Sequence, residues 1–251
     1  MDNQKPIGIF DSGIGGLTVL NELQKILPHE NFIYYADTRH LPYGDKSKEE
    51  IISYSEYIVE YFIKNDVKAI IIACGTASAL AFESLRNNYD IPIFNIIDST
   101  VNYLNSNNIG IIATCASISS NVWDNKILEK LPNANITKVA CPKLVPLAES
   151  GLVNTIEAEI ALTEYLKIIK EKNVDTLILG CTHYPLFLPL IKKILNSNTN
   201  IINIGTPLAI DFKTYLDNNN LNSNQNKIGK IKYVVSGDEN NFLESKKFFG
   251  N

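Results

Sequence analysis

Two short stretches of the chain decide its fold: Ile70-Ile71-Ile72-Ala73-Cys74-Gly75-Thr76 and Leu177-Ile178-Leu179-Gly180-Cys181-Thr182-His183. Each reads as a buried aliphatic strand that ends in a small residue, a cysteine and polar residues, followed by the start of a helix. In open α/β sheets, binding sites form at the carboxyl ends of the strands. We therefore expect two similar α/β units that face each other and bring both cysteines into one cleft.

Short aliphatic runs alternate with longer segments of helical periodicity along the chain, which is typical of an α/β fold with mainly parallel sheets. Strands are predicted at residues 7–10, 32–36, 69–73, 92–97, 109–113, 136–140, 176–179, 201–204 and 232–235. Helices are predicted at residues 16–27, 117–131 and 155–172, after residue 204 and near the C-terminal end. Ser47 and Glu50 form a capping box that begins a further long helix ending near residue 65.

The composition is that of an ordinary globular protein, with 45% hydrophobic and 20% charged residues in a chain of 251. The net charge of −4 argues against nucleic acid as a partner. The chain has no apolar run that could span a bilayer and no signal-peptide core, so we expect no membrane partner. Its four cysteines lack disulfide-scaffold spacing, which favours a reducing cytoplasm.

The cysteines differ in how strongly their surroundings suggest chemistry. A free cysteine is most often a small buried hydrophobe. Cys74 and Cys181 are stronger candidates because polar residues and a predicted helix start follow each of them. Backbone N–H groups and the helix dipole there lower a thiol's pKa from about 8.5 toward neutrality. We interpret Cys141, which precedes Pro142, as structural, leave Cys115 open, and expect both to be dispensable.

His183 lies two residues after Cys181, and a Cys-x-His pattern after a buried strand suggests a proton-handling pair. No CxxC or HxxxH partner lies nearby, so a metal site is not expected. A cysteine hydrolase would use such a couple with an oxyanion hole, but it would leave Cys74 without a role.

The turn Asp11-Ser12-Gly13-Ile14-Gly15-Gly16 follows the first predicted strand. It does not fit the GxGxxG dinucleotide motif, because Thr18 stands where the third glycine belongs. The turn is either a tight strand-to-helix connection or a cradle whose backbone amides hold a carboxylate, with Asp11 beside a substrate ammonium or a thiol. Residues 37–45 contain Leu41-Pro42-Tyr43-Gly44, which is either an ordinary loop or a pocket wall.

Five stretches together resemble the glutamate racemase family, within the aspartate/glutamate racemase superfamily. They occur in family order and extend to about residue 204, and the last is the most specific. The stretches are Gly8-Ile9-Phe10-Asp11-Ser12-Gly13-Ile14-Gly15-Gly16-Leu17, Pro42-Tyr43-Gly44, Ala73-Cys74-Gly75-Thr76-Ala77, Val145-Pro146-Leu147-Ala148-Glu149-Ser150-Gly151 and Leu179-Gly180-Cys181-Thr182-His183-Tyr184-Pro185-Leu186.

The resemblance implies two similar α/β domains with mainly parallel sheets and the active site in the cleft between them. Residues 1–98 plus 207–251 would form the first domain, carrying Asp11 and Cys74, and residues 99–206 the second, carrying Glu149 and Cys181. The implied activity interconverts L- and D-glutamate without a cofactor and supplies D-glutamate for peptidoglycan. A cytoplasmic homodimer is implied as well.

The resemblance also implies roles for individual residues. Cys74 and Cys181 match the two catalytic thiols, Cys74 facing the proton of the D-isomer and Cys181 that of the L-isomer. Asp11 and His183 match the groups that assist the thiols, and Glu149 matches a further acidic residue. The matching substrate-contacting positions are Asp11, Ser12, Tyr43, Gly44, Gly75, Thr76, Thr182 and His183.

The chain departs from the family pattern at Gly75, where the family usually has Asn, and at Ser117, where Thr is common. Loss of the Asn donors predicts a weakened KM for glutamate and a tighter KM in a Gly75→Asn variant. Two alternatives stay open: a racemase of another acidic amino acid such as aspartate, and an amino-acid-binding relative without catalysis.

Overall fold

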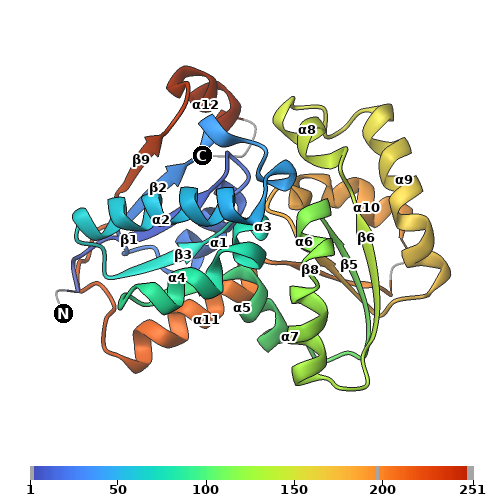
Figure 1. Cartoon of the computed structure of the whole chain (residues 1–251), viewed down its shortest axis with the longest axis horizontal. Coiled ribbons are helices and arrows are strands. Elements are labelled where there is room, and N and C mark those ends of the chain that lie inside the picture. The colour runs from blue at the N-terminus through green and yellow to red at the C-terminus, as the bar shows by residue number, and fades with distance from the viewer. Residues whose placement is uncertain (1–2, 196–197, 248–251) are drawn as a thin grey trace.

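In a computed structural model the chain forms two α/β lobes that lie side by side along the longest axis (Figure 1). The structure describes residues 3–195 and 198–247. The outermost ends of the predicted first domain, residues 1–2 and 248–251, lie outside the described residues. The chain passes from the first lobe to the second once and then returns, so that the first and last described elements, β1 (Ile7–Asp11) and α12 (Glu239–Lys246), both belong to the first lobe.

Each lobe is built on one sheet, and every strand pair in the two sheets is parallel. This confirms the predicted fold class. The first sheet has the order β4 (Ile93–Asn95), β3 (Ala69–Ile72), β1 (Ile7–Asp11), β2 (Phe32–Ala36) and β9 (Ile231–Val235). The second has the order β6 (Asn135–Ala140), β5 (Asn108–Ala113), β7 (Thr176–Leu179) and β8 (Asn200–Asn203). The division of the chain at residues 98/99 and 206/207 stays a prediction.

Helices cover both faces of the first sheet. One face packs against α1 (Leu17–Ile26), α5 (Ile96–Tyr103) and α11 (Gly205–Asn218). The other packs against α2 (Lys48–Lys64), α3 (Gly75–Leu80) and α4 (Phe82–Asn88). Short 3-10 turns, η1 (Thr38–His40) and η2 (Tyr43–Asp45), follow β2, and α12 (Glu239–Lys246) follows β9. The predicted capping box begins α2: Ser47 Oγ accepts from the Glu50 N–H, and Glu50 accepts from the Ser47 N–H.

The second sheet is also covered on both faces. On one side lie α6 (Cys115–Ser119) and α7 (Val122–Lys130), and on the other α8 (Leu144–Glu149), α9 (Ile156–Glu171), η3 (Tyr184–Phe187) and α10 (Leu188–Ile194). The single helix predicted over residues 117–131 is wrong. The chain breaks it between α6 and α7 at Asn121, whose φ of 55° lies in the left-handed region that asparagine tolerates.

The strand predicted over residues 92–97 is also too long. β4 ends at Asn95, whose side-chain oxygen accepts hydrogen bonds from the N–H groups of Ile97 and Asp98 and so begins α5. The aliphatic run Ile96–Ile97 therefore belongs to a buried helix, which packs against α11 and α7. Apolar runs of this length do not distinguish a strand from a buried helix by periodicity.

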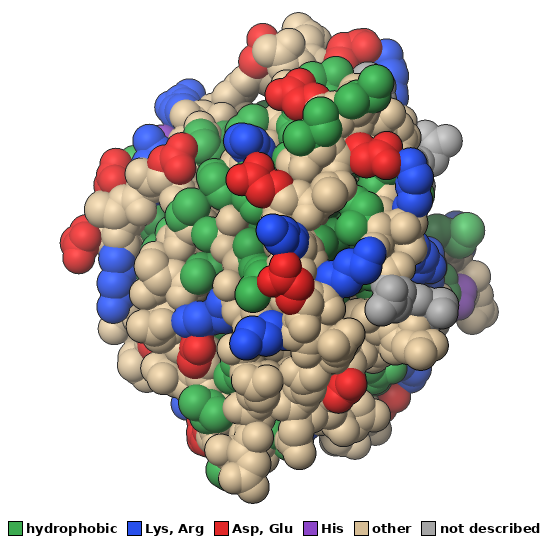
Figure 2. Space-filling view, turned by 90° about the vertical axis from the view of Figure 1, so that its right-hand side faces the viewer, with side chains coloured by type: hydrophobic (Ala, Val, Ile, Leu, Met, Phe, Trp, Pro, Cys, Tyr) green, Lys and Arg blue, Asp and Glu red, His purple; other side chains and the backbone are tan. Residues whose placement is uncertain are grey.

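The outer face of the second lobe mixes hydrophobic, acidic and basic side chains (Figure 2). There α9 buries one stripe of residues, among them Leu162 and Leu166, as its predicted amphipathic pattern requires. Its opposite stripe leaves Ile156 and Ile160 exposed. Within residues 3–195 and 198–247, the chain forms no helix whose length and hydropathy would suit a membrane span.

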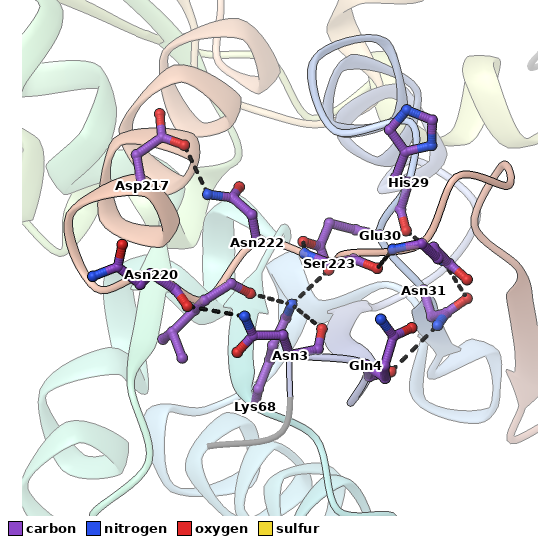
Figure 3. Close-up of polar contacts among 12 residues, drawn as sticks. Asn3, Gln4, His29, Glu30, Asn31, Lys68, Asp217, Asn220, Asn222 and Ser223 are labelled. Carbon is purple, nitrogen blue, oxygen red and sulfur yellow. Dashed lines mark hydrogen bonds and ion pairs between the residues drawn. The ribbon is translucent and has the colours of Figure 1, made fainter.

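A buried ion pair fastens the C-terminal part of the chain to the first sheet (Figure 3). The Lys68 ammonium donates to Glu30 Oε2 at 2.6 Å, to the Leu221 carbonyl at 2.7 Å and to the Asn3 carbonyl at 3.0 Å. The second oxygen of Glu30 accepts from the Ser223 N–H at 2.7 Å. Because every polar atom of this pair has partners, burying its two charges is tolerated. The segment after α11 is thereby held where it can lead into β9.

We expect Lys68→Met to destabilise the fold by about 3–5 kcal/mol, because the substitution leaves the Glu30 carboxylate buried without its cation. Urea unfolding followed by circular dichroism measures the loss. The matched control is Lys213→Met, which removes an exposed i,i+4 pair with Asp217 and should cost far less. Equal losses in the two variants would contradict this account of the Lys68 pair.

Candidate functional site

A pocket lies between the lobes, at the carboxyl ends of the strands of both sheets. The first lobe contributes the turns that follow β1, β2 and β3, and the second those that follow β5, β6 and β7. Nine of the predicted site residues line it: Ser12, Tyr43, Gly44, Cys74, Gly75, Thr76, Cys181, Thr182 and His183. The two remaining predicted residues, Asp11 and Glu149, contact members of this set from behind.

Cys74 follows β3 directly and is buried, with its sulfur 3.9 Å from the Ser12 hydroxyl. Burial raises the pKa of the Cys74 thiol to about 12, and the negative charge of Asp11 adds to the effect. The backbone N–H of Ala77 at the start of α3 acts in the opposite direction. The sequence-based expectation of a lowered pKa is therefore wrong for Cys74, because burial and Asp11 outweigh the local N–H groups.

Cys181 belongs to a chain of three polar side chains. Its sulfur lies 3.8 Å from His183 Nδ1, and His183 Nε2 lies 2.5 Å from Glu149 Oε1. Burial lowers the pKa of His183, but the hydrogen bonds to Cys181 and Glu149 outweigh it, so the pKa is raised well above its usual value. The geometry thus favours a cationic imidazole between Glu149 and the Cys181 sulfur.

Asp11 ends β1 and is wholly buried. One of its oxygens accepts from the Gly13 N–H at 3.0 Å, and the other accepts from the Thr182 hydroxyl at 3.2 Å. Burial raises the pKa of Asp11, while the charge of His183 and the backbone N–H of Gly13 lower it. Asp11 therefore couples the two halves of the site, since it lies beside Cys74 and bonds the turn that carries Cys181.

Tyr43 forms part of the pocket wall and is hydrogen-bonded from behind by Asp37, which directly follows β2. The Tyr43 hydroxyl donates to Asp37 Oδ2 at 2.6 Å, and the Ser236 hydroxyl donates to Asp37 Oδ1 at 2.7 Å. Burial and the Asp37 charge raise the pKa of Tyr43, so this hydroxyl keeps its proton. Of the two interpretations of the 37–45 segment, the pocket wall is the one that the structure supports.

Gly75 lies where the two lobes pack closely against each other. A Cβ added to it would lie 2.5 Å from the carbonyl oxygen of Gly180, a backbone atom of the opposite lobe. Gly15 resembles it, because a Cβ there would lie 2.5 Å from the Thr182 hydroxyl and from the His183 ring. Real Cβ atoms do not approach other atoms so closely, so a side chain at residue 75 would require the backbone of one turn to shift, and one at residue 15 would require the Thr182 and His183 side chains to shift.

Sequence reasoning missed part of the pocket wall. Cys115, which is exposed, and Cys141, which is buried, both line the pocket, together with Thr114, whose hydroxyl lies 3.0 Å from that of Thr76. The strand-end rule that selected Cys181 also applies to these residues, since they follow β5 and β6. That Cys115 and Cys141 are dispensable for activity stays a prediction. Across the described residues, no cluster of three or more His, Cys, Asp or Glu side chains could hold a metal ion.

We expect Asp11→Asn to raise the melting temperature at pH 7. The pKa of Asp11 is raised in the folded state, so its ionisation opposes folding: the contribution of Asp11 to stability is full below its ordinary pKa of 3.8 and is lost as the pH rises through the folded-state pKa. Asn removes the charge and can still accept the Gly13 hydrogen bond. Calorimetry at pH 5 to 8 measures the change in melting temperature. A lowered melting temperature would mean that the two hydrogen bonds to the Asp11 carboxylate stabilise the fold by more than burial of its charge destabilises it.

Comparison with known proteins identifies the family. A family model described as Asp/Glu/Hydantoin racemase matches residues 16–206. The glutamate racemase of Thermoanaerobacter sp. (strain X514) is 41% identical over 247 residues, which cover 96% of this chain and 91% of that protein. Glutamate racemase from Francisella tularensis subsp. tularensis SCHU S4, solved in complex with D-glutamate, has a TM-score of 0.92 at 35% identity and covers 98% of this chain and 94% of its own. A glutamate racemase isoform from Bacillus anthracis has a TM-score of 0.94 at 31% identity, with coverages of 99% and 95%. The chain therefore belongs to the Asp/Glu/Hydantoin racemase family and, within it, to the glutamate racemases.

Proposed function

We propose that the protein interconverts L- and D-glutamate by moving protons with two thiols, Cys74 and Cys181. The observation that carries the proposal is the position of these residues at the carboxyl ends of β3 and β7, in opposite lobes, on the wall of one pocket. Inversion at Cα requires a base on one face and an acid on the other, so two thiols on facing lobes supply what the reaction needs. The substrate named for the closely related racemases supports glutamate.

In the L-to-D direction the Cys181 thiolate takes the Cα proton, and the electron pair of the C–H bond remains on the substrate as a carbanion. The Cys74 thiol then gives its proton to the opposite face. Cys181 ends as a thiol and Cys74 as a thiolate, and the D-to-L direction runs through the same steps in reverse. No redox change occurs, and the proton and electron pair are accounted for by the substrate and the two thiols.

The electrostatics of the pocket suit this division of roles. The raised pKa of Cys74 keeps it a thiol, ready to donate, while the cationic His183 lies 3.8 Å from the sulfur of Cys181. In the D-to-L direction Cys74 must be the base, and the positive charge of the substrate ammonium beside Asp11 would stabilise that thiolate. Glu149 acts on this chemistry through His183, whose ring it holds at 2.5 Å.

The substrate carboxylates must be bound without a Lys or Arg side chain, because the pocket wall formed by the described residues contains neither. Backbone N–H groups of the turns after β1, β3 and β7 provide donors, and hydroxyls are available from Ser12, Thr76 and Thr182. Such preorganised dipoles, in a site that excludes water, also stabilise the developing carbanion. We therefore assign substrate contact to these turns and to the Tyr43–Gly44 wall.

We also infer a setting for this activity from the family resemblance: a homodimer in the cytoplasm that supplies D-glutamate for peptidoglycan. The four cysteines are unpaired and one of them, Cys115, is exposed, which fits a reducing compartment. The proposed first domain is residues 1–98 plus 207–251, and the proposed second domain is residues 99–206. Light scattering tests the dimer, and racemisation assays with glutamate and aspartate test substrate choice against the alternatives of another acidic substrate or binding alone.

We expect Cys74→Ala and Cys181→Ala each to abolish racemisation of glutamate, because each face of Cα loses its acid or base. The assay follows optical rotation and, in D₂O, deuterium at Cα, without added pyridoxal phosphate and in the presence of a chelator. Circular dichroism checks that both variants fold. Cys115→Ala is the matched control, a thiol on the same wall with no assigned role, and should remain active. Substantial turnover in either of the first two variants would refute the two-thiol assignment.

The packing of Gly75 reverses the expectation drawn from the family's Asn. A side chain at this position must push the turns of Cys74 and Cys181 apart, since its Cβ would lie 2.5 Å from the Gly180 carbonyl oxygen. We expect Gly75→Ala to lower kcat about 10- to 100-fold, because displacing reacting groups by a fraction of an ångström to 1 Å is costly. We expect Gly75→Asn to leave KM no tighter. Steady-state kinetics decide the point: a parent-like kcat for Gly75→Ala would mean that the lobes separate without cost.

A further inference from the structure

One side chain of the first lobe forms a hydrogen bond to the turn that carries Cys181. Thr18 lies in the first turn of α1, and its hydroxyl lies 2.8 Å from the carbonyl oxygen of Thr182 in the opposite lobe. The same hydroxyl lies 2.9 Å from the Gly15 carbonyl oxygen, but the Thr18 backbone N–H already donates to Gly15 at 3.0 Å. The single hydroxyl proton is shared between the two carbonyls, and Gly15 keeps its backbone donor when that proton is directed to Thr182.

The first lobe therefore binds Thr182 at both its side chain and its backbone carbonyl. Its side-chain hydroxyl donates to Asp11 at 3.2 Å, and its carbonyl accepts from Thr18. These two bonds fix the orientation of the residue that connects Cys181 to His183. The Asp11 bond is buried and the Thr18 bond is part-buried, and removing either donor leaves an acceptor in the interface without that partner.

We propose that Thr18 is a positioning residue for the reaction: its hydrogen bond across the lobe boundary fixes the Cys181–His183 turn relative to Cys74. The proposal rests on the proposed two-thiol function. Thr18 is absent from the pocket wall formed by the described residues and acts on the chemistry only through Thr182. Glycine at position 15 leaves room for this hydrogen bond, because a Cβ there would lie 2.5 Å from the Thr182 hydroxyl oxygen.

The test compares Thr18→Val, which keeps the shape and removes the hydrogen bond, with Thr18→Ser, which keeps the hydroxyl. We expect Thr18→Val to lower kcat about threefold to tenfold, with a smaller change in KM, and Thr18→Ser to restore kcat to within about twofold. Because the two enantiomers have equal free energies, kcat/KM must fall by the same factor in both directions, which verifies the assay. Thr100→Val is the control: Thr100 is a buried helical threonine outside the pocket wall, and its hydroxyl has no partner among the described residues.

A second measurement does not depend on turnover. Alkylation of Cys181 by iodoacetamide, followed by peptide mass spectrometry, should be several-fold faster in Thr18→Val than in the parent or in Thr100→Val, because the turn is no longer held. Parent-like kcat and alkylation in Thr18→Val, or a Thr18→Ser variant as slow as Thr18→Val, would overturn the positioning role. Failure of the two-thiol function would show itself separately, as turnover that survives Cys181→Ala in the parent chain.

Discussion

The site depends on a contact that two turns make through their backbones. The turn after β3 meets the turn after β7 at Gly75 and Gly180, with room for no Cβ at residue 75. Each of these glycines is the chain neighbour of a cysteine, so the contact between the turns also brings Cys74 and Cys181 to one pocket. Gly75 is therefore a requirement of packing in this chain, and the family's Asn could be accommodated only with a wider separation of the lobes.

Close contact between the lobes also determines the electrostatics. Excluding water raises the pKa values of Cys74 and Asp11, because charge is poorly solvated there. The same exclusion strengthens the hydrogen bonds that hold His183 cationic between Cys181 and Glu149. The pocket thus combines a raised pKa at Cys74 with a cationic imidazole 3.8 Å from the Cys181 sulfur. In the proposed reaction these surroundings give the two thiols different roles, and the charge of the bound substrate would offset the difference when the direction is reversed.

The sequence predicts those features that depend on neighbouring residues. Parallel strands, the Ser47 capping box and the placement of Cys74 and Cys181 at strand ends all follow from local pattern and one rule of sheet topology. Features that depend on tertiary packing could not be predicted from the sequence. The N-cap role of Asn95 was hidden in an aliphatic run, because such a run suits a strand and a buried helix equally. The pKa of Cys74 was expected to fall because helix N–H groups are visible in the sequence, whereas burial and the approach of Asp11 are not.

The pocket wall, finally, depends on the last part of the chain. Tyr43 is held by Asp37, and Asp37 is held by Ser236 at the end of β9, a strand that pairs with β2 almost 200 positions away in the sequence. The bond from Lys68 to the Leu221 carbonyl helps to place β9 at that edge, because it holds the segment before β9 at the far end of the sheet. The return of the chain from the second lobe is thus part of how the first lobe shapes its half of the site. A catalytic cleft assembled from two lobes needs each of them rigid, and the first gains that rigidity from both ends of the chain.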